Sequence, residues 1–133
     1  MNIAVVADGY LIVANLLVGL FQLALALGAP MGEYAWGGRH AGKLPTRLRL
    51  SSLLSAGLLI AISGHYASLI GLLPSMLDAH GRAYSLWALT ALTALSTLGN
   101  WSTKSPAEKR MFLPVSASML LANILILVFY RLG

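Results

Sequence analysis

Residues 10–29 read YLIVANLLVGLFQLALALGA, which is twenty consecutive positions without a formal charge. A helix needs about 20 apolar residues to cross the ~30 Å hydrocarbon layer of a bilayer, so this stretch predicts a first membrane span. A cleaved signal peptide is the alternative reading. It is disfavoured because no Lys or Arg precedes the run, and because the run exceeds the usual apolar core of about 7–15 residues.

The composition of the whole chain agrees with a membrane protein. Of the 133 residues, 58% are hydrophobic and 10% are charged, whereas charged residues make up about 25% of a typical soluble domain. The formal net charge of +5 would also suit a nucleic-acid-binding protein. The basic residues, however, stand at the ends of apolar runs, where membrane proteins carry them, so no nucleic-acid partner is expected. The absence of cysteine excludes disulfides and thiolate chemistry.

Three further uncharged runs follow the first, at residues 50–73, 83–100 and 111–130. The last is preceded by Ser105-Pro106-Ala107-Glu108, a capping-box pattern with proline at the first helical position, which predicts that this helix begins before the bilayer. The second run carries a series of small residues spaced by four and three, which predicts a face for close helix packing; they are Gly57, Ala61, Gly64, Ser68 and Gly71. The predicted fold is all-α, a single domain formed by a bundle of four transmembrane helices.

The basic residues also predict the orientation of this bundle. With four spans, the loops after the first and third spans share one side, and they hold seven of the nine Lys and Arg residues: Arg39, Lys43, Arg47, Arg49, Lys104, Lys109 and Arg110. Arg82 and Arg131 are left on the other side. Because positive loops stay in the cytoplasm, both termini are expected outside.

The same two loops carry a resemblance. The first reads GAPMGEYAWGG over residues 28–38 and continues through Leu44 and Pro45 to Arg47 and Arg49; the second reads GNWSTKSPAEKRMFLP over residues 99–114. Together with the four spans, this resembles a group of small bacterial membrane proteins that pair a "GAPxGE…GG…LP…R" loop with an "N…TxS…EK…P" loop. The resemblance covers nearly the whole chain. It implies a multi-pass protein of the bacterial inner (plasma) membrane and points to the loops, without implying an activity.

Polar side chains form a seam along each predicted helix. Their spacing of three, four or seven keeps them near one helix face: Asp8, Asn15 and Gln22 in the first run, His65 and Tyr66 in the second, Thr90, Thr93, Thr97 and Asn100 in the third, and Ser116, Asn123 and Tyr130 in the fourth. One interpretation is hydrogen bonding between helices, with about 0.6 kcal/mol per pair. The other is a ligand site lined by Asn15, Gln22, Tyr66, Asn100, Asn123 and Tyr130.

Two sets of ionisable residues are candidate catalytic groups. Asp8 and His65 are both predicted in the outer half of the membrane, where such a pair could act as an acid/base couple or proton relay. Glu33 stands in the glycine- and proline-rich loop after the first span, where it could line a site at the membrane surface or pair with Arg47 or Arg49. The capping box accounts for Glu108.

No metal or cofactor is expected. His40, His65 and His80 lie in three separate segments without the short ligand spacings of a metal motif, and HExxH, GxSxG and Walker sequences are absent. The sequence favours a protein that binds a lipophilic small molecule or lipid in a polar pocket between its helices, with chemical conversion of that molecule left open. The alternatives are an oligomeric small transporter or channel, and a non-catalytic helper subunit of a larger membrane protein. Membrane lipids are expected partners in every case.

Overall fold

The computed structural model describes residues 2–132, with side chains described up to residue 129. Its elements, in chain order, are α1 (Ile3–Ala26), the 3-10 turns η1 (Gly32–Tyr34) and η2 (Trp36–Gly38), α2 (Thr46–Leu69), α3 (Ala79–Ser102) and α4 (Pro106–Leu132). The predicted all-α fold of four helices is confirmed. Each predicted span overlaps one helix, although the helix boundaries differ by a few residues.

Local capping explains most of these differences. The side chain of Asn2 accepts a hydrogen bond from the backbone N–H of Ala4, which allows α1 to begin seven residues before the predicted span. The second helix ends four residues early. There Gly71 takes a φ of +81°, and the N–H of Leu72 bonds to the carbonyl of Ala67, as in a Schellman motif.

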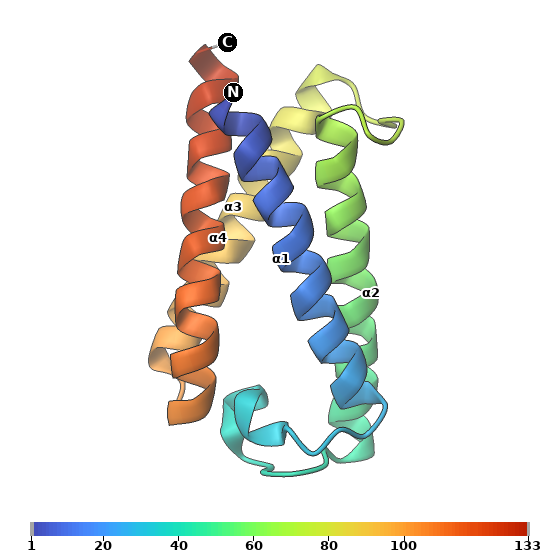
Figure 1. Ribbon diagram of the computed structural model, residues 1–133, viewed down its shortest axis with the longest axis vertical. Coiled ribbons are helices and arrows are strands. Elements are labelled where there is room, and N and C mark those ends of the chain that lie inside the picture. The colour runs from blue at the N-terminus through green and yellow to red at the C-terminus, as the bar shows by residue number, and fades with distance from the viewer. Residues whose placement is uncertain (1, 133) are drawn as a thin grey trace.

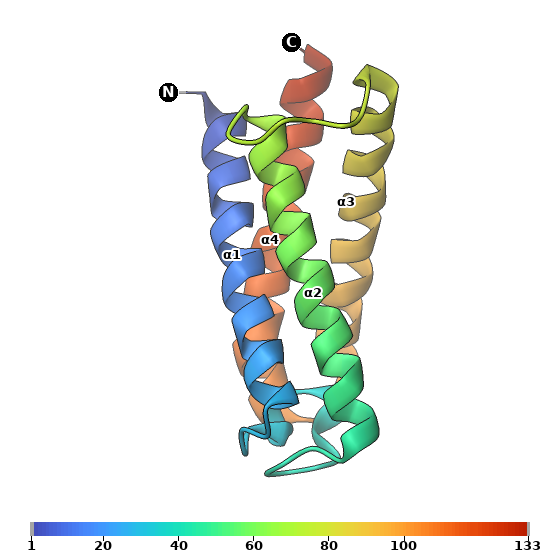
Figure 2. The same ribbon diagram turned by 90° about the vertical axis from the view of Figure 1, so that its right-hand side faces the viewer.

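The four helices form two pairs. In Figure 1, α1 and α2 lie on one side and α3 and α4 on the other, and Figure 2 shows all four running nearly along the long axis. α1 packs against both α2 and α4, and α3 packs against α4, whereas α2 and α3 make little contact. The termini and the α2–α3 connection lie at one end, here called the terminal end. Residues 27–45 and 103–105 lie at the other, here called the loop end.

The main hydrophobic core lies in the half of the bundle nearest the terminal end. It is built from small and branched side chains around one buried tyrosine: Ala7, Leu11, Ala14, Tyr66, Leu86, Met119, Ala122, Ile126 and Leu127. A separate, smaller cluster at the loop end joins Leu25 of α1 to Ala35 and Leu44 of the connection between α1 and α2. The two helix pairs are therefore joined by the main core at the terminal end, and by the connecting loop and the ring contact between Phe21 and Phe112 at the other.

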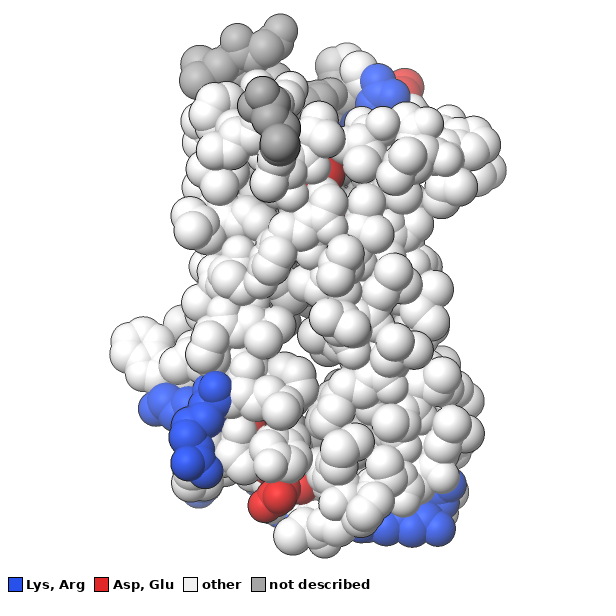
Figure 3. All heavy atoms as spheres, viewed as in Figure 1, with Lys and Arg blue, Asp and Glu red and all other residues white. Residues whose placement is uncertain are grey.

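The surface fits a membrane environment. Within the described residues, three helices are long and apolar enough to cross a membrane: α1, α2 and α4 up to Phe129. α3 has the same length of 24 residues as α1 and α2, but Thr and Ser residues interrupt its apolar sequence. Figure 3 shows that the basic side chains of one face gather near the two ends of the bundle, with a charge-poor band between them.

The expected packing face of the second helix is not used within the chain. A Cβ added at Gly57 would meet no atom within 4 Å, and Ala61 is exposed. The close approach between helices occurs instead at Gly19 of α1, where a Cβ would lie 3.6 Å from the backbone oxygen of Ala56. Within the described residues, α2 meets α1 through a different face from the one that the small residues define.

Candidate ligand cavity between the helix pairs

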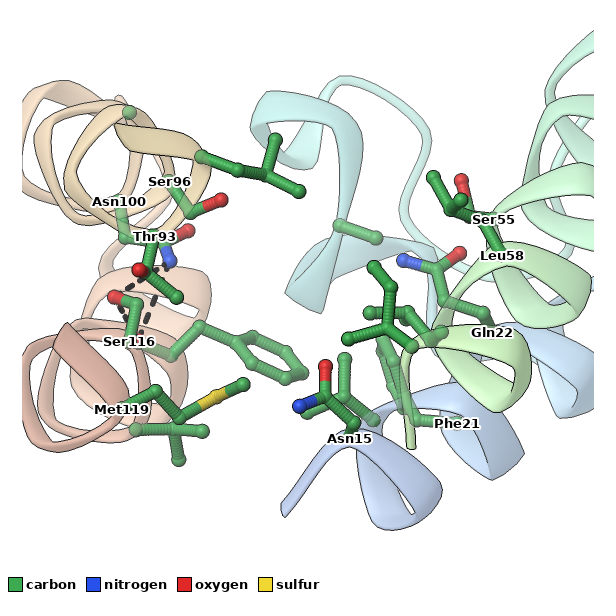
Figure 4. A pocket seen from close by; sticks show the side chains of 18 of the residues that line it. Asn15, Phe21, Gln22, Ser55, Leu58, Thr93, Ser96, Asn100, Ser116 and Met119 are labelled. Atoms are coloured by element: carbon green, nitrogen blue, oxygen red, sulfur yellow. Dashed lines mark hydrogen bonds between the residues drawn. The ribbon is translucent and has the colours of Figure 1, made fainter. Parts of the chain in front are cut away.

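A cavity of about 460 Å³ lies between the α1–α2 pair and the α3–α4 pair. Figure 4 shows Thr93, Ser96, Asn100, Ser116 and Met119 on the α3–α4 side, facing Asn15, Phe21, Gln22, Ser55 and Leu58 on the α1–α2 side. Four of the six predicted ligand-binding residues line this cavity: Asn15, Gln22, Tyr66 and Asn100. Ser116 of α4 lines the cavity too, so residues from the polar seams of all four helices line one cavity.

The loop between α1 and α2 forms the floor of the cavity through Tyr34, Ala35 and Trp36. It is folded in place by hydrogen bonds to both neighbouring helices. The indole N–H of Trp36 donates to the Ser52 hydroxyl of α2 at 3.0 Å, and the backbone N–H of Gly37 donates to the Glu108 carboxylate of α4 at 3.0 Å. The hydroxyl of Ser105 donates to the carbonyl of Glu33. The loop is therefore ordered and packed against the ends of α2 and α4.

The tight course of this loop depends on glycine. The N–H of Gly32 bonds to the carbonyl of Gly42 at 2.8 Å, which draws the two arms of the loop together. A Cβ at position 32 would overlap the carbonyl oxygen of His40 and lie 2.7 Å from that of Gly42. The backbone atoms there leave no room for any side chain.

A buried hydrogen-bond network closes the cavity towards the terminal end. Asn123 is fully buried; its side-chain oxygen accepts from the Tyr66 hydroxyl, and its amide N–H donates to the Thr93 hydroxyl at 3.1 Å. The amide also donates to the carbonyl of Met119 at 3.2 Å. This network links α2, α3 and α4, and its members have few hydrogen-bonding groups left for a ligand.

The polar groups near the floor are less fully paired. The amide of Asn100 donates to the Phe112 carbonyl at 3.2 Å and to the Ser116 hydroxyl at 3.0 Å. The side-chain oxygen of Gln22 is buried and has no hydrogen-bond partner. A buried amide oxygen without a donor costs about 1–3 kcal/mol, and the amide nitrogen of Gln22 points into the cavity in Figure 4.

The cavity opens sideways between α2 and α3. Its exposed lining residues belong to these helices or to the floor: Leu58 (57% exposed), Leu92 (44%), Trp36 (40%), Ser96 and Gly99. The lining residues of α1 and α4 are buried or half-buried. Leu58 and Leu92 stand near the midpoints of two helices of 24 residues each, so this mouth lies at mid-height on the flank of the bundle.

The predicted pairing of Asp8 with His65 does not form among the hydrogen bonds of the described residues. One Asp8 carboxylate oxygen is buried without a partner and lines a separate hollow at the terminal end, together with Arg82 and Leu86. His65 lies on α2 and its Nε2 is 2.8 Å from the Ser85 hydroxyl of α3. The imidazole therefore joins two helices and does not line the cavity between the helix pairs.

The remaining predicted residues take other positions. Glu33 is exposed and does not line the cavity; only its backbone carbonyl is engaged, by Ser105. Asn123 is absent from the lining because it lies within the closing network. The side chain of Tyr130 lies outside the described residues. In the described part of the chain, no three His, Asp or Glu side chains gather in a group that could hold a metal ion.

Glu108 is an acidic lining residue that the sequence reasoning did not assign to the site. Half of the expected capping box is present, since the Glu108 N–H donates to the Ser105 hydroxyl at 3.2 Å. The carboxylate, however, accepts from Gly37 across the cavity floor and is the only acidic or basic side chain in the lining. The pairing of the two loops in the resemblance was the available signal, because Gly37 and Glu108 stand one in each.

Comparison of the chain with protein-family models, curated proteins and solved structures found no match to any of them.

Proposed function

We propose that this chain is a four-span protein of the bacterial plasma membrane that binds a lipophilic small molecule or lipid in the cavity between its helix pairs. The observation that carries the proposal is the cavity itself, with a volume of about 460 Å³. Ligand pockets typically measure about 300–1,000 Å³ and combine apolar walls with a few placed polar groups. Here Phe21, Leu89 and Met119 supply apolar wall, while Gln22 and Glu108 supply polar groups.

The third helix is proposed to be the fourth span, in spite of its hydroxyl groups. Thr90 and Thr93 each donate to the carbonyl four residues earlier at 2.7 Å, and Thr97 does so at 2.8 Å. These hydroxyls therefore present no unpaired donor to lipid, which is the condition for placing them in hydrocarbon. The length of α3, 24 residues, exceeds the roughly 20 that a span requires.

The orientation proposed from the charged loops places both termini outside and the cavity floor on the cytoplasmic side. Reporter fusions at the C-terminus and within residues 101–110 test this. They should report opposite sides of the membrane, with the C-terminus outside. A cytoplasmic signal from the C-terminal fusion would reverse the orientation and place the cavity floor in the outer leaflet.

Binding, without conversion, is the function that the geometry supports best. The only acidic or basic group in the lining is Glu108, and its carboxylate already accepts a hydrogen bond from Gly37. Apart from the phenols of Tyr34 and Tyr66, the lining holds no other titratable group that could exchange protons with Glu108. General acid–base chemistry needs a group positioned at the proton being moved, and this lining offers a recognition surface instead.

The proposal is tested by identifying what the purified protein retains. Organic extracts of the protein, isolated in a mild detergent, should contain a lipophilic compound in near-stoichiometric amount by mass spectrometry. The variant Ser55→Phe places a ring in the cavity, since Ser55 lines it, and should lose the compound. The control Leu54→Phe changes a neighbouring α2 residue that is 77% exposed and outside the lining. Equal retention by both variants would contradict the proposal.

A further inference from the structure

We infer that the ligand is a single-chain amphiphile that enters from the bilayer between α2 and α3, and that its head group donates hydrogen bonds and carries no negative charge. The inference rests on the proposed function and specifies the class of ligand and its route. Three observations carry it: the position of the mouth, the kind of polar atom left free near the floor, and the absence of any basic side chain from the lining.

The mouth faces the part of the bundle surface that would contact lipid. Its rim includes Leu58 on α2 and Leu92 on α3, both exposed and both near the middle of their helices. At that height a bilayer presents hydrocarbon, not water. The floor at the loop end is formed in part by Trp36, which is bonded to Ser52. A molecule dissolved in the bilayer would therefore meet an apolar entrance at mid-height.

Two acceptor side chains lie near the floor. The amide nitrogen of Asn100 donates to Phe112 and Ser116, and its side-chain oxygen remains for a ligand. The Glu108 carboxylate accepts from Gly37 and from the Thr103 side chain, and it retains further acceptor capacity. The Gln22 oxygen is buried, and its amide nitrogen points into the cavity (Figure 4). A head group placed among these side chains has to supply N–H or O–H groups to Asn100 and Glu108.

Charge restricts the head group further. No Lys, Arg or His lines the cavity, and Glu108 is its only acidic residue. A carboxylate or phosphate head group would meet the Glu108 carboxylate in a poorly solvated space, where like charges repel strongly and no cation compensates. An alcohol or an ammonium group matches the same surroundings, and an ammonium group adds charge attraction.

The apolar wall accommodates the tail. Glu108 and Met119 both belong to α4 and both line the cavity, so the lining extends over eleven residues, or about 16 Å at 1.5 Å per residue. Phe112 and Leu89 lie among the apolar lining residues. A volume of about 460 Å³ suits one chain better than a two-chain phospholipid. The head would lie at the loop end and the tail would point to the terminal end, as in a lipid of the adjacent leaflet.

The test compares three probes with the same tail: dodecylamine, dodecanol and dodecanoate. Each is added to the full chain in phosphatidylcholine nanodiscs, and bound probe is quantified by native mass spectrometry against empty nanodiscs. The amine and the alcohol should bind at least ~10-fold more tightly than dodecanoate, because a hydrogen bond to a charged group and the avoided repulsion each correspond to about that ratio. Dodecanoate binding as tightly as dodecylamine would overturn the head-group inference and leave the proposed function standing.

Two matched pairs of variants test where the head group binds and where the probe enters. Glu108→Gln should weaken dodecylamine binding ~10-fold and leave dodecanol nearly unchanged, whereas Glu33→Gln, at the exposed acidic residue of the same end, should change neither. Leu58→Trp should hinder entry and slow binding of every probe, whereas Leu54→Trp should not. Unaltered binding rates in Leu58→Trp would overturn the lateral route. Failure of all three probes to bind the unmodified chain would overturn the proposed function together with the inference.

Discussion

The terminal half and the loop half of the bundle use the same kinds of polar residue in opposite ways. In the terminal half, Asn123 is fully buried and bonds to Tyr66, Thr93 and the Met119 carbonyl. In the loop half, the Gln22 oxygen is buried without a partner beside a cavity. One amide links helices; the other is left available.

The difference arises from how the two helix pairs meet. At the terminal end the main core joins all four helices, so polar side chains find one another across short distances. At the loop end a folded connection lies between the pairs. Contact between the pairs there passes through Trp36, Gly37 and Glu108 and through one ring pair, Phe21 of α1 and Phe112 of α4, whose centroids are 5.0 Å apart. In this bundle, the separation of the surrounding helices therefore decides whether a polar side chain bonds to another helix or remains free to bind a ligand. The residue type does not decide this.

Among the substitutions that test the difference between the two halves, Gly32→Ala is expected to have the largest effect on stability. The added methyl group would overlap backbone carbonyl oxygens of His40 and Gly42, so the loop should lose at least ~3 kcal/mol of local stability. Hydrogen exchange of residues 28–45 should become much faster, while amides of the terminal half keep their protection. Gly57→Ala is the control, since nothing lies within 4 Å of its added Cβ. Unchanged exchange in residues 28–45 would show that the loop does not have this conformation.

A smaller effect is expected from Asn123→Leu in the terminal half. The change leaves the Tyr66 hydroxyl buried without its partner and should lower the free energy of unfolding by about 2 kcal/mol. Asn15→Leu provides the comparison, because Asn15 donates only to the Leu11 carbonyl of its own helix, and should cost no more than about 0.6 kcal/mol. Unfolding in a denaturing detergent measures both. Equal losses would mean that the network does not hold the helices together.

The smallest effect on stability is expected from Gln22→Met in the loop half. Methionine is close in shape and removes a buried oxygen that has no donor, so the free energy of unfolding should stay within about 1 kcal/mol or increase. Ligand binding should nevertheless weaken, because the amide group that lines the cavity is lost. A clear loss of stability with unchanged binding would assign Gln22 to the structure and remove it from the site.

The sequence was sufficient for those parts of the fold that depend on local pattern. Uncharged runs of about 20 residues predicted all four helices, and the seam residues Asn15, Gln22, Tyr66 and Asn100 line one cavity as their spacing suggested. The small-residue face of α2 is not the face that meets α1, because helical spacing defines faces without saying which neighbour each one meets. Glu108 was missed for a related reason: a capping box predicts the local partner, and the distant Gly37 competes for the same carboxylate.

The most direct test of the central claim is a density map of the full chain in lipid nanodiscs at a resolution that shows side chains. The account predicts elongated density, not belonging to protein, that enters between Leu58 and Leu92 and ends near Gln22 and Glu108. It also predicts that the floor residues Tyr34 and Trp36 remain folded beneath that density. Helices α2 and α3 closed against each other, with side chains filling the space between the helix pairs and no additional density, would contradict it.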